Sequence, residues 1–183
     1  MRVIGGEFRG RKLLAPARGH IRPTSDRVRE AIFDVLGPEW NYQKVLDLFA
    51  GTGALGIEAI SRGAQEAVFV EQGRRALKIL RGNLEALGLT SRARILPMAV
   101  KKGIKVLADR DEAFDLVFMD PPYGKGLVGA TLQQIEKGGI LSPFGVVVAE
   151  HSPTEIIPLP MGLEQYLEKR YGDTIISLFR RAS

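Results

Sequence analysis

The chain has 183 residues, of which 45% are hydrophobic and 26% charged, and these are ordinary values for a globular protein with one well-buried domain. It has no cysteine, which excludes disulfide and thiolate chemistry. No segment approaches the roughly 18 apolar residues of a membrane span, and no signal peptide is recognisable, so we expect a cytoplasmic protein.

The net charge of +5 is concentrated in the first part of the chain. Residues 1–29, here called the basic arm, carry eight basic and two acidic side chains, a net +6, which leaves about −1 for the rest. A basic arm on a nearly neutral body indicates a polyanionic partner, and a solvated charged segment is the alternative. The basic side chains are Arg2, Arg9, Arg11, Lys12, Arg18, Arg22, Arg27 and Arg29.

The first element that we expect is a small β-hairpin over residues 2–16, where β-forming residues are interrupted by turn glycines. A helix follows, capped by Thr24 or Ser25 and ended by Gly37 and Pro38. One face of this helix is apolar, with side chains at Val28, Ile32, Val35 and Leu36.

From Gln43 onward, short apolar segments alternate with helical segments. The apolar segments lie at residues 44–50, 66–71, 92–98, 114–120 and 145–151. They are apolar at nearly every position, which is typical of parallel strands that are buried on both faces. Helices are expected at residues 54–62, 74–87, near 104 and at 127–137. Such repeated units of strand and helix predict a doubly wound α/β sheet.

The C-terminal part departs from this alternation. Residues 163–172 and 173–181 are two successive strand-like segments joined through Gly172 and Asp173, which is a hairpin signal. A parallel sheet that ends in an antiparallel hairpin is unusual among dinucleotide-binding folds. We therefore divide the chain into a basic N-terminal extension, residues 1–42, and an α/β domain, residues 43–183.

The loop after the first parallel strand has glycines at positions 51, 53 and 56, which match the G-x-G-x-x-G pattern of dinucleotide-binding proteins. Glycines between a strand and a helix permit a tight turn and let a ligand approach the backbone. The acid expected about 20 residues further on is Glu71, whose carboxylate can accept hydrogen bonds from both ribose hydroxyls. An adenosine-containing ligand is therefore predicted, and both NAD and S-adenosylmethionine (AdoMet) fit this description.

Asp47 favours AdoMet over NAD. A carboxylate beside the loop repels a pyrophosphate, whereas AdoMet has a cationic ammonium and a cationic sulfonium. The alternatives are structural: Asp47 caps the glycine loop through backbone N–H groups, and Glu71 is a solvated strand end.

A sharper signal is the sequence DPPY at residues 120–123, where the strand over 114–120 ends. The two prolines have fixed φ angles and no N–H, so the carbonyls there are rigid acceptors. The lone pair of an exocyclic amine on a nucleobase is delocalised into the ring. Acceptance of both amine hydrogens, by Asp120 and by the Pro121 carbonyl, frees that lone pair for attack, and Tyr123 can stack on the base. A proline-rich turn without chemistry is the alternative.

Over nearly its whole length the chain resembles the RsmD family, in the segments RVIGGEFRGRKL, RPTSDRVREAIFDVL, LDLFAGTGALGIEAISRGA and DLVFMDPPY. Members of this family are class I AdoMet-dependent methyltransferases of bacteria that modify N2 of guanine 966 in 16S rRNA. The first two segments make the match specific, because the other two are shared with many methyltransferases.

The resemblance implies a seven-stranded sheet of order 3-2-1-4-5-7-6, with AdoMet as cofactor and S-adenosylhomocysteine as product. It implies action on the small ribosomal subunit or an assembly intermediate, and we expect the protein to be a monomer. It places around AdoMet the residues Asp47, Phe49, Ala50, Gly51, Thr52, Gly53, Glu71, Met98, Ala99 and Asp120. It places around the guanine amine Asp120, Pro121, Pro122 and Tyr123. The residues that it implies for rRNA binding are Arg2, Arg9, Arg11, Lys12, Arg18, Arg22, Thr24 and Arg27.

Two positions depart from the family pattern. Met98 and Ala99 stand where many relatives have an Asp or Asn that contacts the adenine amine, so adenine recognition here would rest on backbone groups and apolar contact. Gly73 stands where relatives often have a polar residue. The two histidines, far apart in the chain, give no metal signature.

Three other functions stay open. The DPPY motif also suits methylation of adenine N6 or cytosine N4 in DNA, or of a protein glutamine, and the choice of guanine rests on the family resemblance. A nicotinamide-dependent oxidoreductase would explain the glycine loop alone, and an inactive RNA-binding module would explain the basic arm alone.

Overall fold

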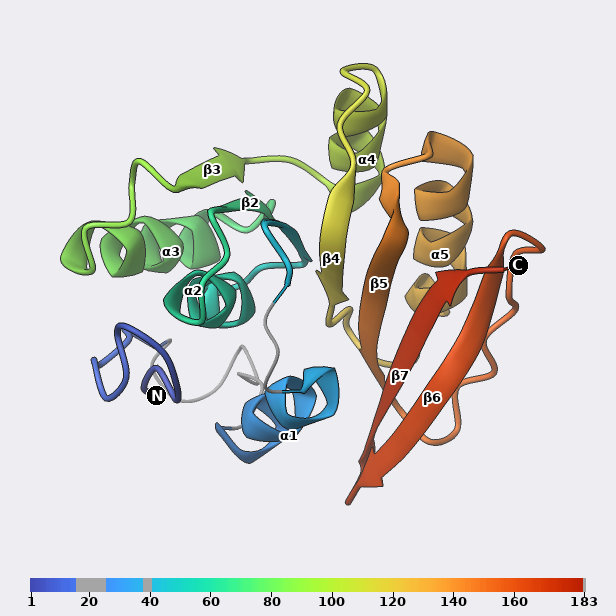
Figure 1. The fold of residues 1–183 in the computed structure, drawn as a ribbon, viewed down its shortest axis with the longest axis horizontal. Helices are drawn as coiled ribbons and strands as arrows, with labels where there is room; N and C mark the ends of the chain where they lie inside the picture. The colour runs from blue at the N-terminus through green and yellow to red at the C-terminus, as the bar shows by residue number, and fades with distance from the viewer. Residues whose placement is uncertain (16–25, 38–40, 183) are drawn as a thin grey trace.

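The computed structural model describes residues 1–15, 26–37 and 41–182. One seven-stranded sheet, of order β3-β2-β1-β4-β5-β7-β6, runs through the molecule (Figure 1), which confirms the predicted strand order. Its strands are β1 Lys44–Leu48, β2 Glu66–Val70, β3 Ala93–Leu96, β4 Phe114–Met119, β5 Leu141–His151, β6 Leu163–Tyr171 and β7 Thr174–Arg181. The helices are α1 Asp26–Leu36, α2 Ala54–Ser61, α3 Arg74–Ala86, α4 Val100–Ala108 and α5 Leu127–Gly138.

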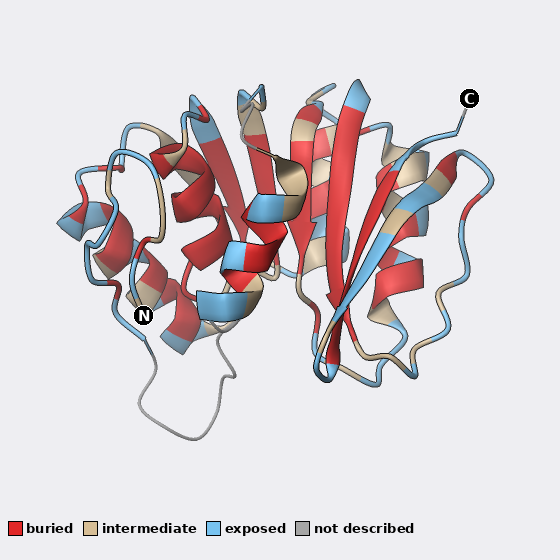
Figure 2. Cartoon of the chain, turned by 60° about the horizontal axis from the view of Figure 1, so that its bottom comes forward, coloured by how far each residue is buried: buried red, intermediate tan, exposed pale blue. Residues whose placement is uncertain are grey.

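The central strands are apolar at consecutive positions because both faces of the sheet are covered (Figure 2). Successive side chains of a strand point to opposite faces. Val45 accordingly packs in a cluster with side chains of α1, α2 and α3, whereas its neighbour Leu46 packs with side chains of α4 and α5. The two helical layers are therefore fixed by alternate residues of the same strands. None of the helices in the described part of the chain is long and apolar enough to cross a membrane.

The pairing changes from parallel to antiparallel at the end of the chain. Strands β1 to β5 are parallel to one another, and β7 pairs antiparallel with both β5 and β6. The turn between β6 and β7 contains Gly172, whose φ of 62° requires the left-handed region that glycine adopts readily. The hairpin predicted at Gly172 and Asp173 is thus confirmed, and β6 is the exposed edge strand.

Strand β5 begins four residues earlier than the apolar pattern predicts. Leu141 pairs with Phe114, and the next pair is Val146 with Leu116, so an irregularity in register lies between them. Ser142 and Pro143 stand in this irregular part and interrupt the apolar pattern, which is why the sequence indicated only residues 145–151.

The predicted N-terminal hairpin is present in a short form, closed by one antiparallel bridge between Arg2 and Lys12. It is held by its own backbone hydrogen bonds and also by α2. The buried Glu58 carboxylate accepts the N–H groups of Ile4 at 2.8 Å and Gly5 at 2.7 Å, and it also pairs with Arg62 Nε at 2.9 Å. A two-stranded hairpin is marginal in water. These side-chain acceptors therefore fix the position of the segment on the body.

We expect Glu58→Ala to lower the free energy of unfolding by about 3 kcal/mol, because it leaves two backbone N–H groups and a guanidinium without their buried acceptor. Urea denaturation measures the change, and Glu85→Ala on the exposed face of α3 is the control, with an expected change within about 0.5 kcal/mol. Equal stability of the two variants would contradict the anchoring role of Glu58.

Candidate active site

The register of the parallel strands brings the predicted site residues to one edge of the sheet. Leu48 pairs with both Val70 and Met119, and Met119 also pairs with Ala149. The residues that follow these positions lie side by side at the carboxyl edge, namely Phe49, Glu71, Asp120 and Glu150. The strand order reverses between β1 and β4, and this is where open α/β sheets bind ligands.

The glycine loop is a tight turn between β1 and α2. Phe49, Gly51 and Gly53 all have positive φ, at 60°, 55° and 81°. The turn is closed by the Ala50 N–H, which donates to the Val70 carbonyl at 3.0 Å, and by the Gly53 N–H, which donates to the Ala50 carbonyl at 2.7 Å. A loop of this shape exposes backbone groups at the edge of the sheet.

Glycine stands at the three positions of the pattern for different structural reasons. A Cβ on Gly53 would lie 2.3 Å from Leu80 Cδ1, and a Cβ on Gly56 would lie 2.4 Å from the ring of Phe69. Both positions therefore need glycine so that α2 can pack closely on its neighbours. At Gly51 the nearest atom to such a Cβ is 3.8 Å away, an ordinary van der Waals distance, so packing does not require glycine there.

Asp47 is buried just before the end of β1, with 2% of its surface exposed. Its carboxylate accepts the N–H of Gly56 at 2.9 Å, in the first turn of α2. Burial raises the pKa of the Asp47 carboxyl well above its usual range, this hydrogen bond opposes the increase, and the nearby Asp120 and Glu71 add to it. Asp47 therefore has the capping role that the sequence left open. Because its pKa is raised, a nearby cation would also stabilise the ionised form of this carboxyl.

Glu71 holds the loop with both carboxylate oxygens. Oε2 accepts the Gly51 N–H at 2.8 Å, and Oε1 accepts the Gly73 N–H at 2.6 Å. Each carboxylate oxygen has a second lone-pair site, so these bonds leave acceptor capacity for a ligand. Glu71 therefore does more than stand at a solvated strand end, because it joins the glycine loop to the start of α3.

The other residues predicted around the cofactor also lie at this edge. Ala50 and Thr52 are buried in the loop, and Phe49 and Met98 pack partly against the core on the α4 and α5 side. Ala99 is exposed and precedes α4 directly. No side-chain oxygen follows β3 at positions 98 and 99, as the sequence indicates.

Residues 120–123 leave the edge of the sheet after β4. Pro121 is buried, Pro122 is exposed, and Asp120 and Tyr123 are half-buried. The Tyr123 hydroxyl donates to Glu150 Oε1 at 2.8 Å and lies 3.1 Å from Thr174 Oγ1. Burial raises the pKa of Tyr123 to about 12, with Glu150 and Asp120 adding to the increase and Thr174 opposing it. The phenol is therefore neutral at physiological pH, and its ring is tied to β5 and β7.

Three residues of this arrangement were missed by the sequence reasoning: Glu150, Thr174 and Asn83. Glu150 ends an apolar strand just as Glu71 and Asp120 do, and this signal was available. Thr174 gave no signal, because its contact with Tyr123 depends on the pairing of β7 with β5.

Asn83 connects the N-terminal segment to the glycine loop. Its Oδ1 accepts the Leu14 N–H at 2.7 Å, and its Nδ2 donates to the Thr52 carbonyl at 2.9 Å and to the Leu14 carbonyl at 3.2 Å. Asn83 is 1% exposed, so its amide is a fixed bridge between Leu14 and Thr52. Leu14 is 69 positions from Asn83 in the sequence, and Thr52 is 31 positions from it.

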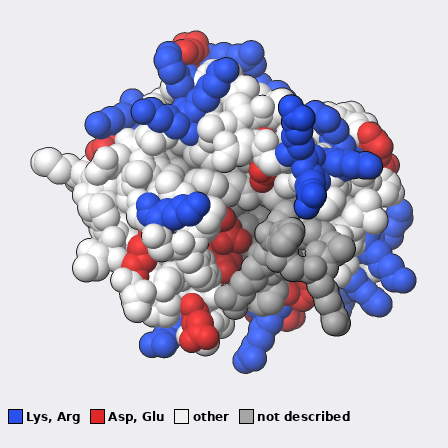
Figure 3. All heavy atoms as spheres, turned by 180° about the vertical axis from the view of Figure 1, so that it is seen from behind, with Lys and Arg blue, Asp and Glu red and all other residues white. Residues whose placement is uncertain are grey.

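The predicted RNA-binding residues are described only in part. Arg2, Arg9, Arg11, Lys12 and Arg27 are exposed, and Arg11 Nη2 donates to the Ala86 carbonyl at the end of α3 at 3.2 Å. Arg18, Arg22 and Thr24 lie outside the described residues. On the face shown in Figure 3, Lys and Arg side chains stand in groups around the rim, and acidic side chains also lie near the centre.

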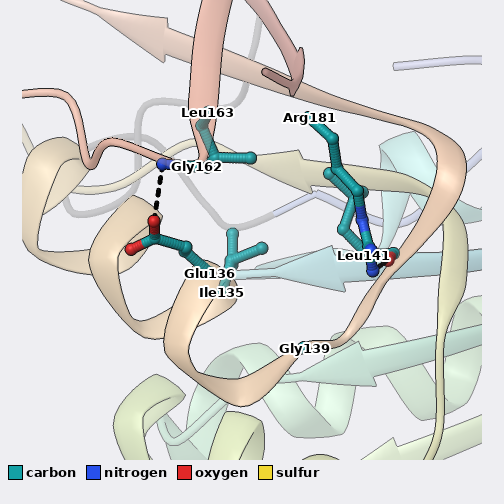
Figure 4. Close-up of a pocket in the computed structure, with 7 residues that line it drawn as sticks. All are labelled: Ile135, Glu136, Gly139, Leu141, Gly162, Leu163 and Arg181. Carbon is teal, nitrogen blue, oxygen red and sulfur yellow. Dashed lines mark hydrogen bonds between the residues drawn. The ribbon is translucent and has the colours of Figure 1, made fainter. Parts of the chain in front are cut away.

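A cavity of about 230 Å³ lies elsewhere, at the C-terminal end of α5 (Figure 4). Gly162 N–H donates to Glu136 Oε1 at 2.6 Å there, and Arg181 donates to the Leu141 carbonyl. Helix α5 begins shortly after the 120–123 loop and has 12 residues, so it is about 18 Å long. The cavity lies at its far end and is therefore separated from that loop by the length of the helix. Its charged groups already have partners, so we assign it no role in the site.

Comparison with known proteins gives matches over the whole chain. The family model described as Conserved hypothetical protein 95 matches residues 1–180. The putative rRNA methyltransferase YlbH of Bacillus subtilis is 37% identical over 182 residues, which are 99% of each chain. Ribosomal RNA small subunit methyltransferase D of Escherichia coli (strain K12) is 36% identical over 182 residues, or 99% of this chain and 90% of that one. The solved structure of the putative methyltransferase yhhF from Escherichia coli has a TM-score of 0.84 at 32% identity, and the match covers 100% of this chain and 98% of that chain.

The raised pKa of Asp47 predicts how stability depends on pH. Between the pKa of an unfolded aspartate, about 4, and the higher folded value, the folded state binds more protons, so the stability of the wild type falls as the pH rises through that window. Asp47→Asn keeps an acceptor for the Gly56 N–H and has no such titration. We therefore expect its stability relative to the wild type to increase with pH above about 4. Urea denaturation over a pH series, with the exposed Asp111→Asn as control, measures this difference, and a difference that does not change with pH would contradict the assignment.

Proposed function

This chain belongs to the family described as Conserved hypothetical protein 95, the RsmD family, and from this membership we propose that it is an rRNA methyltransferase that uses AdoMet. The finer proposal is that a monomer methylates the exocyclic N2 amine of a guanine in 16S rRNA, guanine 966 by resemblance, within the small subunit or an assembly intermediate. The observation that carries it is the position of Asp120 beside the carboxylates Asp47 and Glu71 at one edge of the sheet, where Tyr123 is held to Glu150.

The residues at this edge of the sheet fit AdoMet. A Cβ at Gly51 would meet no atom closer than 3.8 Å, so a ligand can approach the backbone there. The raised pKa of Asp47 means that a cation improves the environment of this carboxyl, which suits the ammonium of the methionine part. Glu71 retains acceptor sites for ribose hydroxyls, and Phe49, Met98 and Ala99 offer backbone and apolar contact to the adenine. AdoMet, when bound, supplies an electrophilic methyl group on sulfur.

The 120–123 loop suits the acceptor amine. One hydrogen of the amine would bond to the Asp120 carboxylate and the other to the Pro121 carbonyl, so that the nitrogen lone pair points away from both. In the transfer, the new N–C bond would form as the C–S bond breaks, which would leave an acidic proton on the nitrogen. Asp120, directly or through water, would accept that proton. Tyr123, tied at its hydroxyl, would present its ring to the base.

The exposed basic residues of the N-terminal segment favour RNA as the polyanion. Arg9, Arg11 and Lys12 lie on a segment that is anchored to α2 and α3, so their charges have a defined position relative to the site. Phosphate contacts of this kind position a protein on RNA, while the site reads the base.

Transfer of labelled methyl groups from AdoMet to unmodified small ribosomal subunits, followed by mapping of the modified nucleotide, tests this function. We expect one labelled guanine at N2. Label on adenine or cytosine would overturn the choice of base. Calorimetry that finds binding of NAD and none of AdoMet would overturn the methyltransferase assignment as a whole.

We expect Asp120→Ala to lower kcat by a factor of about 10² to 10⁴, because the amine loses its carboxylate acceptor, while the affinity for small subunits stays within about twofold. Asp120→Asn is the matched control, since its amide oxygen still accepts one hydrogen and part of the activity should remain. Full activity of the alanine variant would remove Asp120 from the mechanism.

Tyr123 variants separate the ring from its hydroxyl. Tyr123→Phe keeps the ring and loses the bond to Glu150, so we expect the KM for small subunits to rise about fivefold. Tyr123→Ala also loses stacking and should raise KM about 10- to 100-fold. Ser177→Ala, which breaks the 2.8 Å contact with His151 Nε2 at the same end of the sheet, is the control and should leave KM unchanged. An alanine variant with the KM of the wild type would exclude stacking on Tyr123.

A further inference from the structure

Helix α3 presents a row of basic side chains that the basic arm does not include. Arg74, Lys78 and Arg81 follow one another at spacings of four and three residues, which places them on one face of the helix, and Arg75 flanks them. All four are exposed. None of the ion pairs between described residues involves them. The opposite face of α3 is buried, with Ala76, Leu77, Leu80, Asn83 and Leu84.

This row is continuous with the N-terminal segment. Asn83, two residues after Arg81, is hydrogen-bonded to Leu14, and Arg11 donates to the Ala86 carbonyl at the end of the same helix. The exposed Arg11 and Lys12 therefore lie at the C-terminal end of α3. The side of the molecule that carries α3, at the left of Figure 1 and so at the right of Figure 3, shows several Lys and Arg side chains. Two basic segments that are separate in the sequence thus form one surface.

The row also reaches the carboxyl edge of the sheet. Arg74 follows Gly73, whose N–H is held by Glu71, and Glu71 in turn holds Gly51 of the glycine loop. From Arg74 to Arg81 the helix rises about 10 Å. One strand of a duplex carries about three phosphates over that length of axis.

We propose that Arg74, Lys78 and Arg81 bind the phosphate backbone of the rRNA next to the target nucleotide, as the continuation of the surface that begins at Arg11 and Lys12. This inference rests on the proposed function, since it assigns part of that substrate's binding surface. The chemistry of the helix favours a nucleic acid over a membrane. A helix that binds a lipid surface exposes large apolar side chains beside its basic ones, whereas the leucines of α3 are buried, Ile79 is half-buried, and the small Ala86 is the one exposed apolar side chain of this helix.

The test is a triple variant, Arg74→Gln, Lys78→Gln and Arg81→Gln, because glutamine removes the charge and keeps helix propensity. At saturating AdoMet and physiological salt we expect its KM for unmodified small subunits to rise about 10- to 100-fold, with kcat within about twofold. Between about 50 and 200 mM salt, the slope of log KM against log salt should fall by about two to three, one for each lost phosphate contact. The Kd for AdoMet and the Tm should equal those of the wild type.

The matched control neutralises three exposed lysines that belong to α4, α5 and the edge strand β6, namely Lys102, Lys137 and Lys169. It changes the net charge by the same amount. A rise in KM that is equal in the two triple variants would show an effect of net charge alone and would overturn the proposal. The double variant Lys78→Gln and Arg81→Gln, which leaves Arg74 beside Gly73, should retain about two thirds of the change in slope.

Other outcomes are also decisive. If the wild type transfers no methyl group to small subunits, the proposed function fails. If it does and the α3 variant has the KM and slope of the wild type, only this inference fails. Loss of AdoMet binding in the variant would show that the row acts on the cofactor site and would overturn the proposal. Wild-type binding to phosphatidylserine vesicles that the variant loses, with KM unchanged, would overturn it in favour of a membrane surface.

Discussion

The site depends on one constraint, the parallel register of β1, β2, β4 and β5, which brings the ends of four strands to the same edge of the sheet. Each strand ends in or beside a carboxylate: Asp47, Glu71, Asp120 and Glu150. Like charges at one edge, one of them on the buried Asp47, are unfavourable in the absence of donors or cations. The local structure meets part of this requirement with backbone N–H groups. A cofactor with cationic groups and an amine with two N–H donors would meet the rest, so the same electrostatic condition accounts for both halves of the proposed reaction.

The carboxylates that would bind the ligand also build the loop that receives it. Asp47 holds the first turn of α2 through Gly56, and Glu71 holds both Gly51 and Gly73. A structural and a functional role were alternatives for these residues at the level of the sequence, yet the contacts show that the structural role is real and leaves acceptor capacity in place. A substitution at either position will therefore change the shape of the loop together with its charge. Conservative variants such as Asp47→Asn are informative for this reason, because they preserve an acceptor oxygen and remove the titrating group.

Much of the fold was predictable because its signals are local. Consecutive apolar residues identified the buried strands, and Gly172 with Asp173 identified the terminal hairpin. The glycine pattern identified the right loop, although only Gly51 has room for a Cβ, and Gly53 and Gly56 are required by packing against Leu80 and Phe69. The contacts of Tyr123 with Glu150 and Thr174, and those of Asn83 with Leu14 and Thr52, were not predictable. They join residues 27 to 69 positions apart, and such pairs meet only after the sheet has assembled.

The positions of the acidic and basic groups on the surface describe this molecule better than its net charge does. Outside the first 29 residues the net charge is close to zero, which suggests a neutral body. In the structure that body has acidic groups at the carboxyl edge of the sheet and a basic row on α3, and the anchored N-terminal segment extends the row. A nucleic acid has the complementary separation, with anionic phosphates outside and bases that carry N–H donors. The basic row would attract the phosphates and the acidic edge would attract the amine, whereas the acidic edge would repel a phosphate. The arrangement of charge would then orient the base toward Asp120 before any base-specific contact forms, and an evenly basic surface of the same net charge would bind RNA without that orientation.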